Sequence, residues 1–317
     1  MLETLQKICK ACGDPLRNRV LRVLKQESYG VLELCSILSC PQSRMSHHLK
    51  TLQQAGLVDT RKDGTHVFYR RILPPEGHET HNLHRSLFEI IDGTALESDE
   101  MQEVSKIREE RKALSLEFFE QNAKSLREKQ DVIVSFDSYF SFISQKLSHT
   151  ESPKDTCLEV GPGAGESLSW LSQNFGQVFA LDNSNTMLEE AKRRGESEHL
   201  ENVTFLEGEV DSLTEDFRVD TALINMVLHH VASPEIFLGQ VAKYINYNGY
   251  LAIADLCPHE QEWARTHCGD LWLGLKTEDI SQWAQQVGFK QLECEFLSFK
   301  NGFQVQIFLF QKVKEST

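Results

Sequence analysis

The chain has 317 residues, of which 40% are hydrophobic and 25% charged; this is enough for two compact domains, and nothing in it indicates disorder. The apolar runs are short, and the first ten residues, MLETLQKICK, lack the apolar stretch of a signal peptide, so we expect a cytoplasmic protein without membrane segments. The eight cysteines show no paired CxxC arrangement of the zinc-binding kind, so we expect no metal site.

The net charge of −14 is distributed unevenly. Residues 1–73 contain twelve basic and six acidic residues, a charge of +6, whereas the remainder has 21 basic and 41 acidic residues, a charge of −20. A basic unit is therefore joined to an acidic one, and only the first is suited to a polyanion such as DNA.

The basic unit is predicted to be helical and to end in a hairpin. Apolar spacing predicts four short helices, over residues 5–12, 20–24, 31–38 and 41–52. The segment VDTRKDGTHVFYRRI then predicts two strands around Asp63-Gly64, a dipeptide that favours a tight turn. Helices followed by a basic hairpin are the outline of a winged helix-turn-helix.

Three segments of this unit resemble the ArsR-type family of bacterial repressors: KACGDPLRNRVLRVL at 10–24, SRMSHHLKTLQQAGLV at 43–58 and RKDGTHVFYR at 61–70. The resemblance implies operator DNA as the partner, with the recognition helix in the major groove and basic residues on phosphates. The residues it assigns to DNA binding are Gln42, Ser43, Arg44, Ser46, His47, His48, Lys50, Arg61 and Lys62.

Two features qualify this resemblance. Where metal-sensing members carry a cysteine pair, this chain has Gly30 and Leu32, so a metal site of that type is not expected. The alternative to DNA binding is that the winged helix serves only for dimerisation. Plant small-molecule O-methyltransferases resemble this arrangement, with an N-terminal winged-helix domain that forms the dimer and does not bind DNA. The charge of +6 and the polar recognition helix favour DNA.

A connector follows, over residues 76–130. HNLHRSLFEII has the apolar spacing of a helix, and a helix at this place pairs across the dimer in ArsR-type proteins, so we expect a homodimer. The charged segment 98–130 carries an apolar island. It is interpreted either as a solvated spacer helix or as a lid in which Phe118, Phe119 and Leu126 cover a ligand.

The acidic unit, residues 131–317, alternates apolar strands with helices and closes with two strands at 290–299 and 303–312. This alternation predicts an α/β fold, a Rossmann-like parallel sheet with helices on both faces and an antiparallel pair at the end. In such a sheet the ligand lies beyond the carboxyl ends of the strands, where a glycine-rich loop lets the backbone approach it.

The first strand of this unit leads into such a loop, in CLEVGPGAGESLSWLSQNFGQVFALD at 157–182. Glu159 precedes three glycines, and Asp182 ends the next strand, where its carboxylate can accept hydrogen bonds from both hydroxyls of a ribose. Glu159 suits a cationic amino-acid group. These details favour S-adenosyl-L-methionine over a dinucleotide.

The acidic unit resembles the class I S-adenosylmethionine-dependent methyltransferases over residues 117–312. FLEGEVDSL at 205–213, NMVLHHV at 225–231 and NGYLAIAD at 248–255 resemble three further segments of that family, although Asn248 stands where Pro or Gly is common. The resemblance implies cofactor contacts from Glu159, Gly161, Gly163, Gly165, Asp182, Asn183, Glu209, Val210 and Asn225.

His229 is the candidate catalytic residue, because a histidine at the matching place deprotonates hydroxyls in the plant-type enzymes. The alternative is that His229 and His230 only cap the strand. We therefore predict a homodimeric ArsR-type regulator with a methyltransferase domain acting on a small molecule. Two alternatives stay open: an enzyme whose winged helix only dimerises, and a regulator that senses S-adenosylmethionine or S-adenosylhomocysteine without turnover.

Overall fold

The structure is a computed structural model that describes residues 2–25, 27–74, 77–122, 126–151 and 154–314, without the side chains of residues 126–128. The chain forms two compact units, residues 1–110 and 111–317. This division falls inside the connector predicted over residues 76–130. Among the described residues, no helix has the length and apolar character needed to span a membrane.

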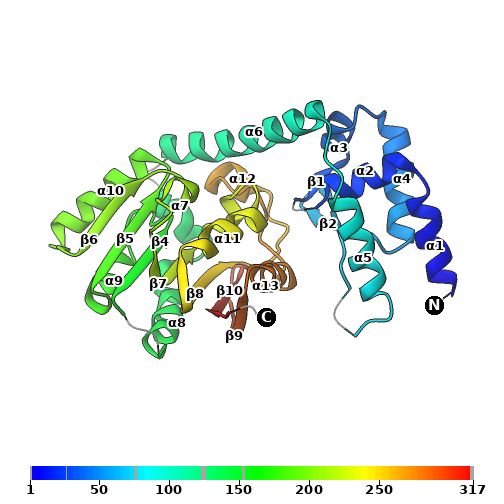
Figure 1. Ribbon diagram of the computed structural model, residues 1–317. Helices are drawn as coiled ribbons and strands as arrows, with labels where there is room; N and C mark the ends of the chain where they lie inside the picture. Colours follow the sequence, from blue (N-terminus) through cyan, green and yellow to red (C-terminus); the bar gives the residue numbers. More distant parts are fainter. Residues whose placement is uncertain (1, 26, 75–76, 123–125, 152–153, 315–317) are drawn as a thin grey trace. The chain divides into compact units, whose positions relative to one another are not determined.

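The first unit is helical with a small three-stranded sheet, seen at the blue end of the chain in Figure 1. Its helices are α1 (Leu2–Cys12), α2 (Pro15–Val23), α3 (Val31–Ile37), α4 (Gln42–Gln54), α5 (His81–Asp92) and the first part of α6 (Ser98–Asn122). Its strands are β1 (Tyr29–Gly30), β2 (Val58–Asp63) and β3 (His66–Arg71), in the order β1-β3-β2.

Local chemistry explains the start of α2 and the wing. Asp14 caps α2, because its Oδ1 accepts the backbone N–H groups of Leu16 (2.9 Å) and Arg17 (3.1 Å). The wing is the antiparallel pair β2 and β3, with Asp63 opposite His66 and Gly64 in the turn at a φ of +60°. The predicted winged helix is confirmed, and β1 adds a strand that was not predicted.

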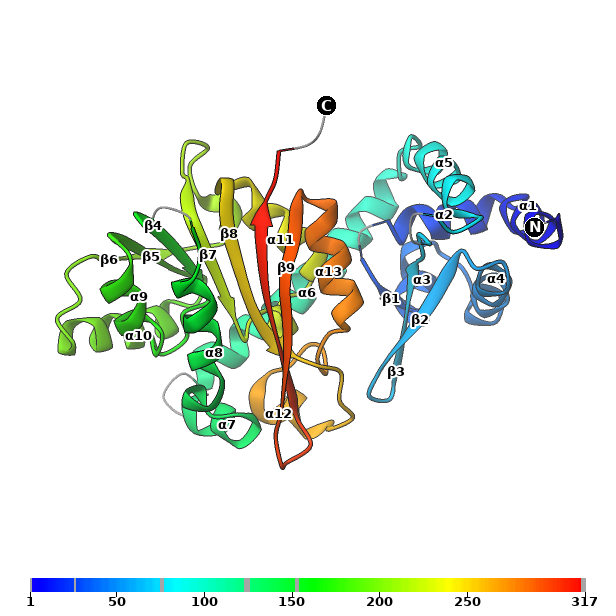
Figure 2. The same ribbon diagram turned by 90° about the horizontal axis from the view of Figure 1, so that it is seen from below.

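The second unit is a seven-stranded sheet with helices on both sides (Figures 1 and 2). The strands are β4 (Thr156–Val160), β5 (Gln177–Asp182), β6 (Val203–Glu207), β7 (Val219–Asn225), β8 (Ile245–Leu256), β9 (Phe289–Ser298) and β10 (Gln304–Lys312). The helices are the end of α6, α7 (Leu126–Ile133), α8 (Phe136–Ser148), α9 (Leu168–Asn174), α10 (Asn185–Ser197), α11 (Pro234–Lys243), α12 (Trp263–Cys268) and α13 (Thr277–Gln286), with short 3₁₀ turns η2 (Val210–Ser212) and η3 (Leu228–His230).

The strand order is β6-β5-β4-β7-β8-β10-β9, and β10 runs antiparallel between β8 and β9. Strands β4 to β8 are parallel, so their carboxyl ends share one edge of the sheet. One core cluster packs α8 and α9 against alternate residues of the sheet, among them Cys157, Val178 and Ala252. The predicted α/β sheet with a closing antiparallel pair is confirmed. The helices α8 and α12 were not predicted.

Candidate functional site

The residues predicted to bind a cofactor gather at the carboxyl ends of β4, β5 and β7. Glu159 is 1% exposed, and the Ser167 hydroxyl donates a hydrogen bond to its Oε1. Within the described residues its other oxygen, Oε2, is buried without a hydrogen-bond partner. Burial raises the pKa of Glu159 to about 7 although the Ser167 hydrogen bond opposes this. A buried carboxylate with an unused oxygen is suited to a cationic ligand group.

The three glycines of the loop all have positive φ, at +71°, +59° and +79°. A Cβ at Gly161 would lie 2.6 Å from a methyl of Val227, and one at Gly165 would lie 3.0 Å from Leu168. At Gly163, by contrast, a Cβ would meet no atom of the described chain within 4 Å. Gly161 and Gly165 are therefore needed for packing, whereas Gly163 faces open space in which a ligand can approach the backbone.

Asp182 ends β5, where its Oδ1 accepts the N–H of Ser184 (2.9 Å). Burial raises the pKa of Asp182 to about 6 despite hydrogen bonds from the backbone. Next to it, the Asn183 amide donates to Glu209 Oε1 (3.1 Å), and Lys112 of α6 lies 3.7 Å from the same oxygen. The structure thus brings Asn183 and Glu209 together beside the end of β5.

The remaining predicted contacts lie in the same part of the unit. Val210 is 2% exposed and begins η2, directly after Glu209. Asn225 ends β7, beside Tyr139 of α8. Tyr139 was not predicted, because α8 has no motif that marks it.

His229 lies in η3, just beyond the end of β7, and is 3% exposed. Its Nδ1 lies 2.9 Å from Asp255 Oδ1, and the Asp255 carboxylate also accepts the N–H groups of Leu228 (2.9 Å) and Leu256 (2.8 Å). Because the carboxylate only accepts, Nδ1 of His229 is the donor. Its Nε2 lies 3.8 Å from Asp270 Oδ1.

These carboxylates decide the charge of His229. Burial disfavours the imidazolium, but Asp255 and Asp270 outweigh it and raise the pKa of His229 to about 9. His229 therefore carries its proton at neutral pH, which weakens it as a general base. Its neighbour His230 contacts the Gly269 carbonyl oxygen through Nδ1 (3.1 Å), and burial lowers the pKa of His230 well below its usual range.

The end of α6 covers this part of the second unit. Phe118 and Phe119 pack on the buried Met187 of α10, and the Phe119 ring meets the His230 ring edge-on at 4.9 Å. A Cβ at Gly269 would clash with the Phe118 ring at 2.3 Å. This packing supports the lid interpretation over the solvated spacer. The side chain of Leu126, the third expected member of the lid, lies outside the described residues.

Helix α4 of the first unit presents most of its predicted DNA contacts to solvent. Exposed residues are Gln42, Ser43, Arg44, Ser46, His47 and Lys50, while Met45, Leu49 and Leu52 are buried. Lys62 is exposed on the wing. These side chains form the candidate nucleic-acid interface.

The structure corrects two predicted DNA contacts, His48 and Arg61, which are each 5% exposed. His48 shares the buried stripe of α4 with Met45 and Leu49, and its Nδ1 lies 3.5 Å from an Arg17 nitrogen. Arg61 is on the inner side of β2, with its guanidinium 6.0 Å from the centre of the Phe68 ring. The heptad-like spacing of α4 and the alternation of β2 turn both side chains inward.

Comparisons with known proteins match each unit separately. Residues 14–60 match the family model described as bacterial regulatory protein, arsR family. An uncharacterised helix-turn-helix transcriptional regulator of Methanocaldococcus jannaschii is 43% identical over 68 residues, which are 21% of this chain and 76% of that protein. The chain belongs to the ArsR family. The helix-turn-helix transcriptional repressor SmtB of Mycobacterium tuberculosis is 33% identical over 70 residues, 22% of this chain and 52% of SmtB.

The second unit of this ArsR protein matches the family model described as methyltransferase domain, over residues 158–253. A solved complex of the Trm112 methyltransferase activator and a methyltransferase from Haloferax volcanii has a similar fold, with a TM-score of 0.50, 16% identity, and coverage of 62% of this chain and 98% of that chain. The second unit is thus an S-adenosylmethionine-dependent methyltransferase domain, fused to an ArsR DNA-binding domain.

Proposed function

We propose that the protein is an operator-binding ArsR regulator whose second unit binds S-adenosyl-L-methionine and transfers a methyl group to a small molecule. Two observations carry the cofactor assignment: the unused, buried oxygen of Glu159, and the open space at Gly163, four residues further along the chain. An unpaired buried carboxylate is costly unless a ligand satisfies it. The cofactor supplies an ammonium group for this carboxylate and an electrophilic methyl group for the reaction.

The other residues hold the remaining parts of the cofactor. Asp182 accepts hydrogen bonds from the ribose hydroxyls, and Asn183 lies beside it. Glu209 and the Val210 backbone face the adenine, which requires Glu209 to exchange its contact with Lys112 for the ligand. Gly161, Gly163 and Gly165 shape the loop, and Asn225 contributes from the end of β7. Phe118 and Phe119 exclude water from the covered side.

The role of His229 separates two candidate functions. In the enzyme, His229 accepts a proton from the methyl acceptor, which requires it to be neutral when the acceptor binds. The second candidate is a regulator that senses S-adenosylmethionine or S-adenosylhomocysteine without turnover. The raised pKa of His229 is on the side of this second candidate, because a protonated imidazole cannot accept a proton. The match of residues 158–253 to the methyltransferase domain keeps methyl transfer as the first candidate.

We further propose that DNA is contacted by the exposed set Gln42, Ser43, Arg44, Ser46, His47, Lys50 and Lys62, without His48 and Arg61. A homodimer is supported by exposed apolar side chains on α1 and α5, among them Leu2 at 76% and Ile90 at 73% exposure. The domain bounds proposed are 1–75, 76–130 and 131–317.

The test is to titrate S-adenosylmethionine and S-adenosylhomocysteine into the full chain, with and without its upstream DNA. If ligand binding and DNA binding are coupled, the ligand affinity must differ between the protein alone and the protein on DNA, since coupling is reciprocal. Equal affinities would refute the coupling and leave an uncoupled enzyme. Asp182→Ala is expected to abolish ligand binding with the fold intact, whereas Asp216→Ala, an exposed aspartate of the same unit, is the matched control. Retained affinity in Asp182→Ala would refute the site.

A further inference from the structure

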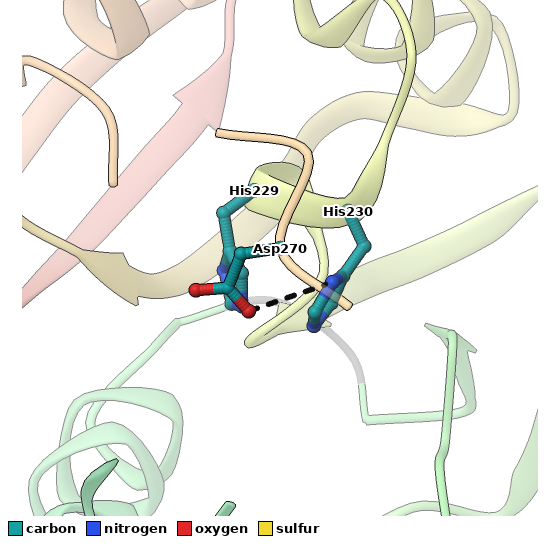
Figure 3. A group of neighbouring side chains, drawn as sticks. All are labelled: His229, His230 and Asp270. Carbon is teal, nitrogen blue, oxygen red and sulfur yellow. Dashed lines mark ion pairs between the residues drawn. The ribbon is translucent and has the colours of Figure 1, made fainter. Parts of the chain in front are cut away.

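Three side chains that commonly bind metals meet beyond the end of β7 (Figure 3). His229 and His230 come from η3, and Asp270 comes from the loop after α12. They are 3%, 7% and 3% exposed. Each offers one ligand atom, and these atoms all lie within 4.8 Å of one another. The closest pairs join Asp270 Oδ1 to His229 Nε2 (3.8 Å) and to His230 Nδ1 (3.9 Å).

The surroundings of the two histidines resemble those of metal ligands. A histidine that binds a metal through one nitrogen usually donates its other N–H to a carboxylate or a backbone carbonyl, which fixes the ring. Here Nδ1 of His229 is bonded to Asp255 (2.9 Å), and Nδ1 of His230 to the Gly269 carbonyl oxygen (3.1 Å). Metal binding displaces any proton from Nε2, and in the neutral rings that result these bonds leave the lone pair on Nε2 of each histidine.

One of these nitrogens has no other use in the described part of the chain. Nε2 of His230 is buried, and no hydrogen-bond partner for it is found among the described residues. The two imidazole rings lie with their centres 4.0 Å apart, so both can approach one small ion. A buried nitrogen without a partner is a second observation, independent of the clustering, that indicates a ligand.

We propose that His229, His230 and Asp270 bind one divalent transition-metal ion, such as zinc or cobalt. Two imidazoles and one carboxylate are the donor set of many open metal sites, in which further positions remain for water or substrate. Bonds of about 2.0–2.2 Å to each ligand require the donor atoms to approach within roughly 3–3.5 Å of one another. Asp270 Oδ1 and His229 Nε2 lie 3.8 Å apart, and one donor atom of each residue lies within 4.8 Å of the others. Binding therefore requires the donor atoms to move together by roughly 0.5–1.5 Å.

The site lies four residues beyond Asn225, at the same edge of the sheet as the proposed cofactor contacts. With the metal bound, His229 cannot also accept the proton of the methyl acceptor. The open positions would instead bind an oxygen of the acceptor, and a bound metal lowers the pKa of such an oxygen. This extension depends on the proposed function. Metal binding itself does not, because it is measured without cofactor or acceptor. The cysteine spacing predicts no metal site, and Asp270 lies 40 residues beyond His230 in the chain, so no local motif marks the three ligands.

The test uses the full chain, freed of metal with a chelator and titrated with Co²⁺ alone. One Co²⁺ per chain is expected, with visible d–d absorption and no thiolate-to-metal charge-transfer band. The second criterion matters because the eight free cysteines are the competing ligands. Loading with Cu²⁺ is expected to show nitrogen couplings from two imidazoles in the electron paramagnetic resonance spectrum. Absence of stoichiometric binding, a thiolate band that accounts for all of the metal, or absence of nitrogen coupling would overturn the proposal.

Three variants locate the metal. Asp270→Asn and His230→Gln remove one ligand each, and we expect Co²⁺ affinity to fall by at least about 10-fold in both. Asp255→Asn keeps all three ligands but weakens the support of His229, for which about 10–100-fold is expected. His149→Gln, a change at the end of α8, is the control. Circular dichroism checks that each variant is folded. Wild-type affinity in folded ligand variants would refute the site, and the wild-type spectra remain decisive if a variant does not fold.

Discussion

Glu159→Gln should make the free protein more stable at alkaline pH while weakening its binding of S-adenosylmethionine. Glu159 is 1% exposed, and its pKa is raised to about 7, mainly by burial. The ordinary value is 4.5. Glutamine has the same shape, and its carbonyl oxygen can still accept the Ser167 hydroxyl. The substitution therefore removes one buried charge with little change in packing.

The sign of the effect follows from proton linkage. A carboxyl whose pKa is higher in the folded state holds its proton there more tightly, so its stabilising contribution is complete below about pH 4.5 and is lost as the pH rises through about 7. Each pKa unit corresponds to about 1.4 kcal/mol. Between pH 5 and pH 8 the wild-type protein should lose about 2–3 kcal/mol through Glu159, a loss that the glutamine variant lacks.

Tryptophan fluorescence during urea unfolding is the assay, because all four tryptophans lie in the second unit and report on it alone: Trp170, Trp263, Trp272 and Trp283. The difference in unfolding free energy between variant and wild type should grow by about 2–3 kcal/mol from pH 5 to pH 8. Glu196→Gln, an exposed change on α10, should give no such trend. Parallel pH profiles for Glu159→Gln and wild type would refute the reasoning.

The same variant should bind S-adenosylmethionine about 10–100-fold more weakly at pH 8, because a charge-assisted hydrogen bond contributes about 1.5–3 kcal/mol. Calorimetric titration measures this. Stability and affinity would thus change in opposite directions at one residue. A variant that gained stability and kept full affinity would show that Glu159 does not contact the ligand.

Three further predictions concern the loop, the lid and the DNA surface. Gly163→Ala should cost about 1–2 kcal/mol at its φ of +59° and abolish cofactor binding in titrations, because the methyl enters the open space. Phe119→Ala should speed ligand release in stopped-flow measurements, whereas Leu114→Ala, 63% exposed on the same helix, should not. Fluorescence anisotropy measures operator binding. Arg44→Ala should weaken it by about 1–3 kcal/mol, and Lys62→Ala should reduce the slope of log affinity against log salt concentration by about 1.

Much of the fold could be predicted because its signals are local. The alternation of apolar strands with helices predicted the five strands β4 to β8 along the chain, and the Asp63-Gly64 turn predicted the wing. What could not be predicted is the pairing of distant segments. The position of β10 between β8 and β9 depends on which edge strand offers the better apolar partner, and no local pattern encodes that choice.

In the candidate site, too, residues close together in the sequence could be predicted and distant ones could not. Glu159, the loop glycines and Asp182 lie within one strand–loop–helix–strand segment, so their spacing alone brings them together. Asp255 and Asp270 are 26 and 41 residues from His229, and their roles depend on how β8 and the loop after α12 return to η3. The predicted exposure of His48 is wrong for a different reason: polar residues usually lie at the surface, but position 48 of α4 faces the core.

Helix α6 is the element through which a ligand signal would have to pass along the chain. On the side of the first unit, its Glu100 is buried against Arg19, and its Arg108 pairs with Glu27 (2.7 Å). On the side of the second unit, its Lys112 pairs with Glu209 and its Phe119 packs on His230. A cofactor that takes the hydrogen bond of Glu209 competes directly with Lys112. Under the proposed function, cofactor binding would thus displace Lys112 of α6 from Glu209. Any resulting effect of the cofactor on DNA affinity would be matched by an equal effect of DNA on cofactor affinity.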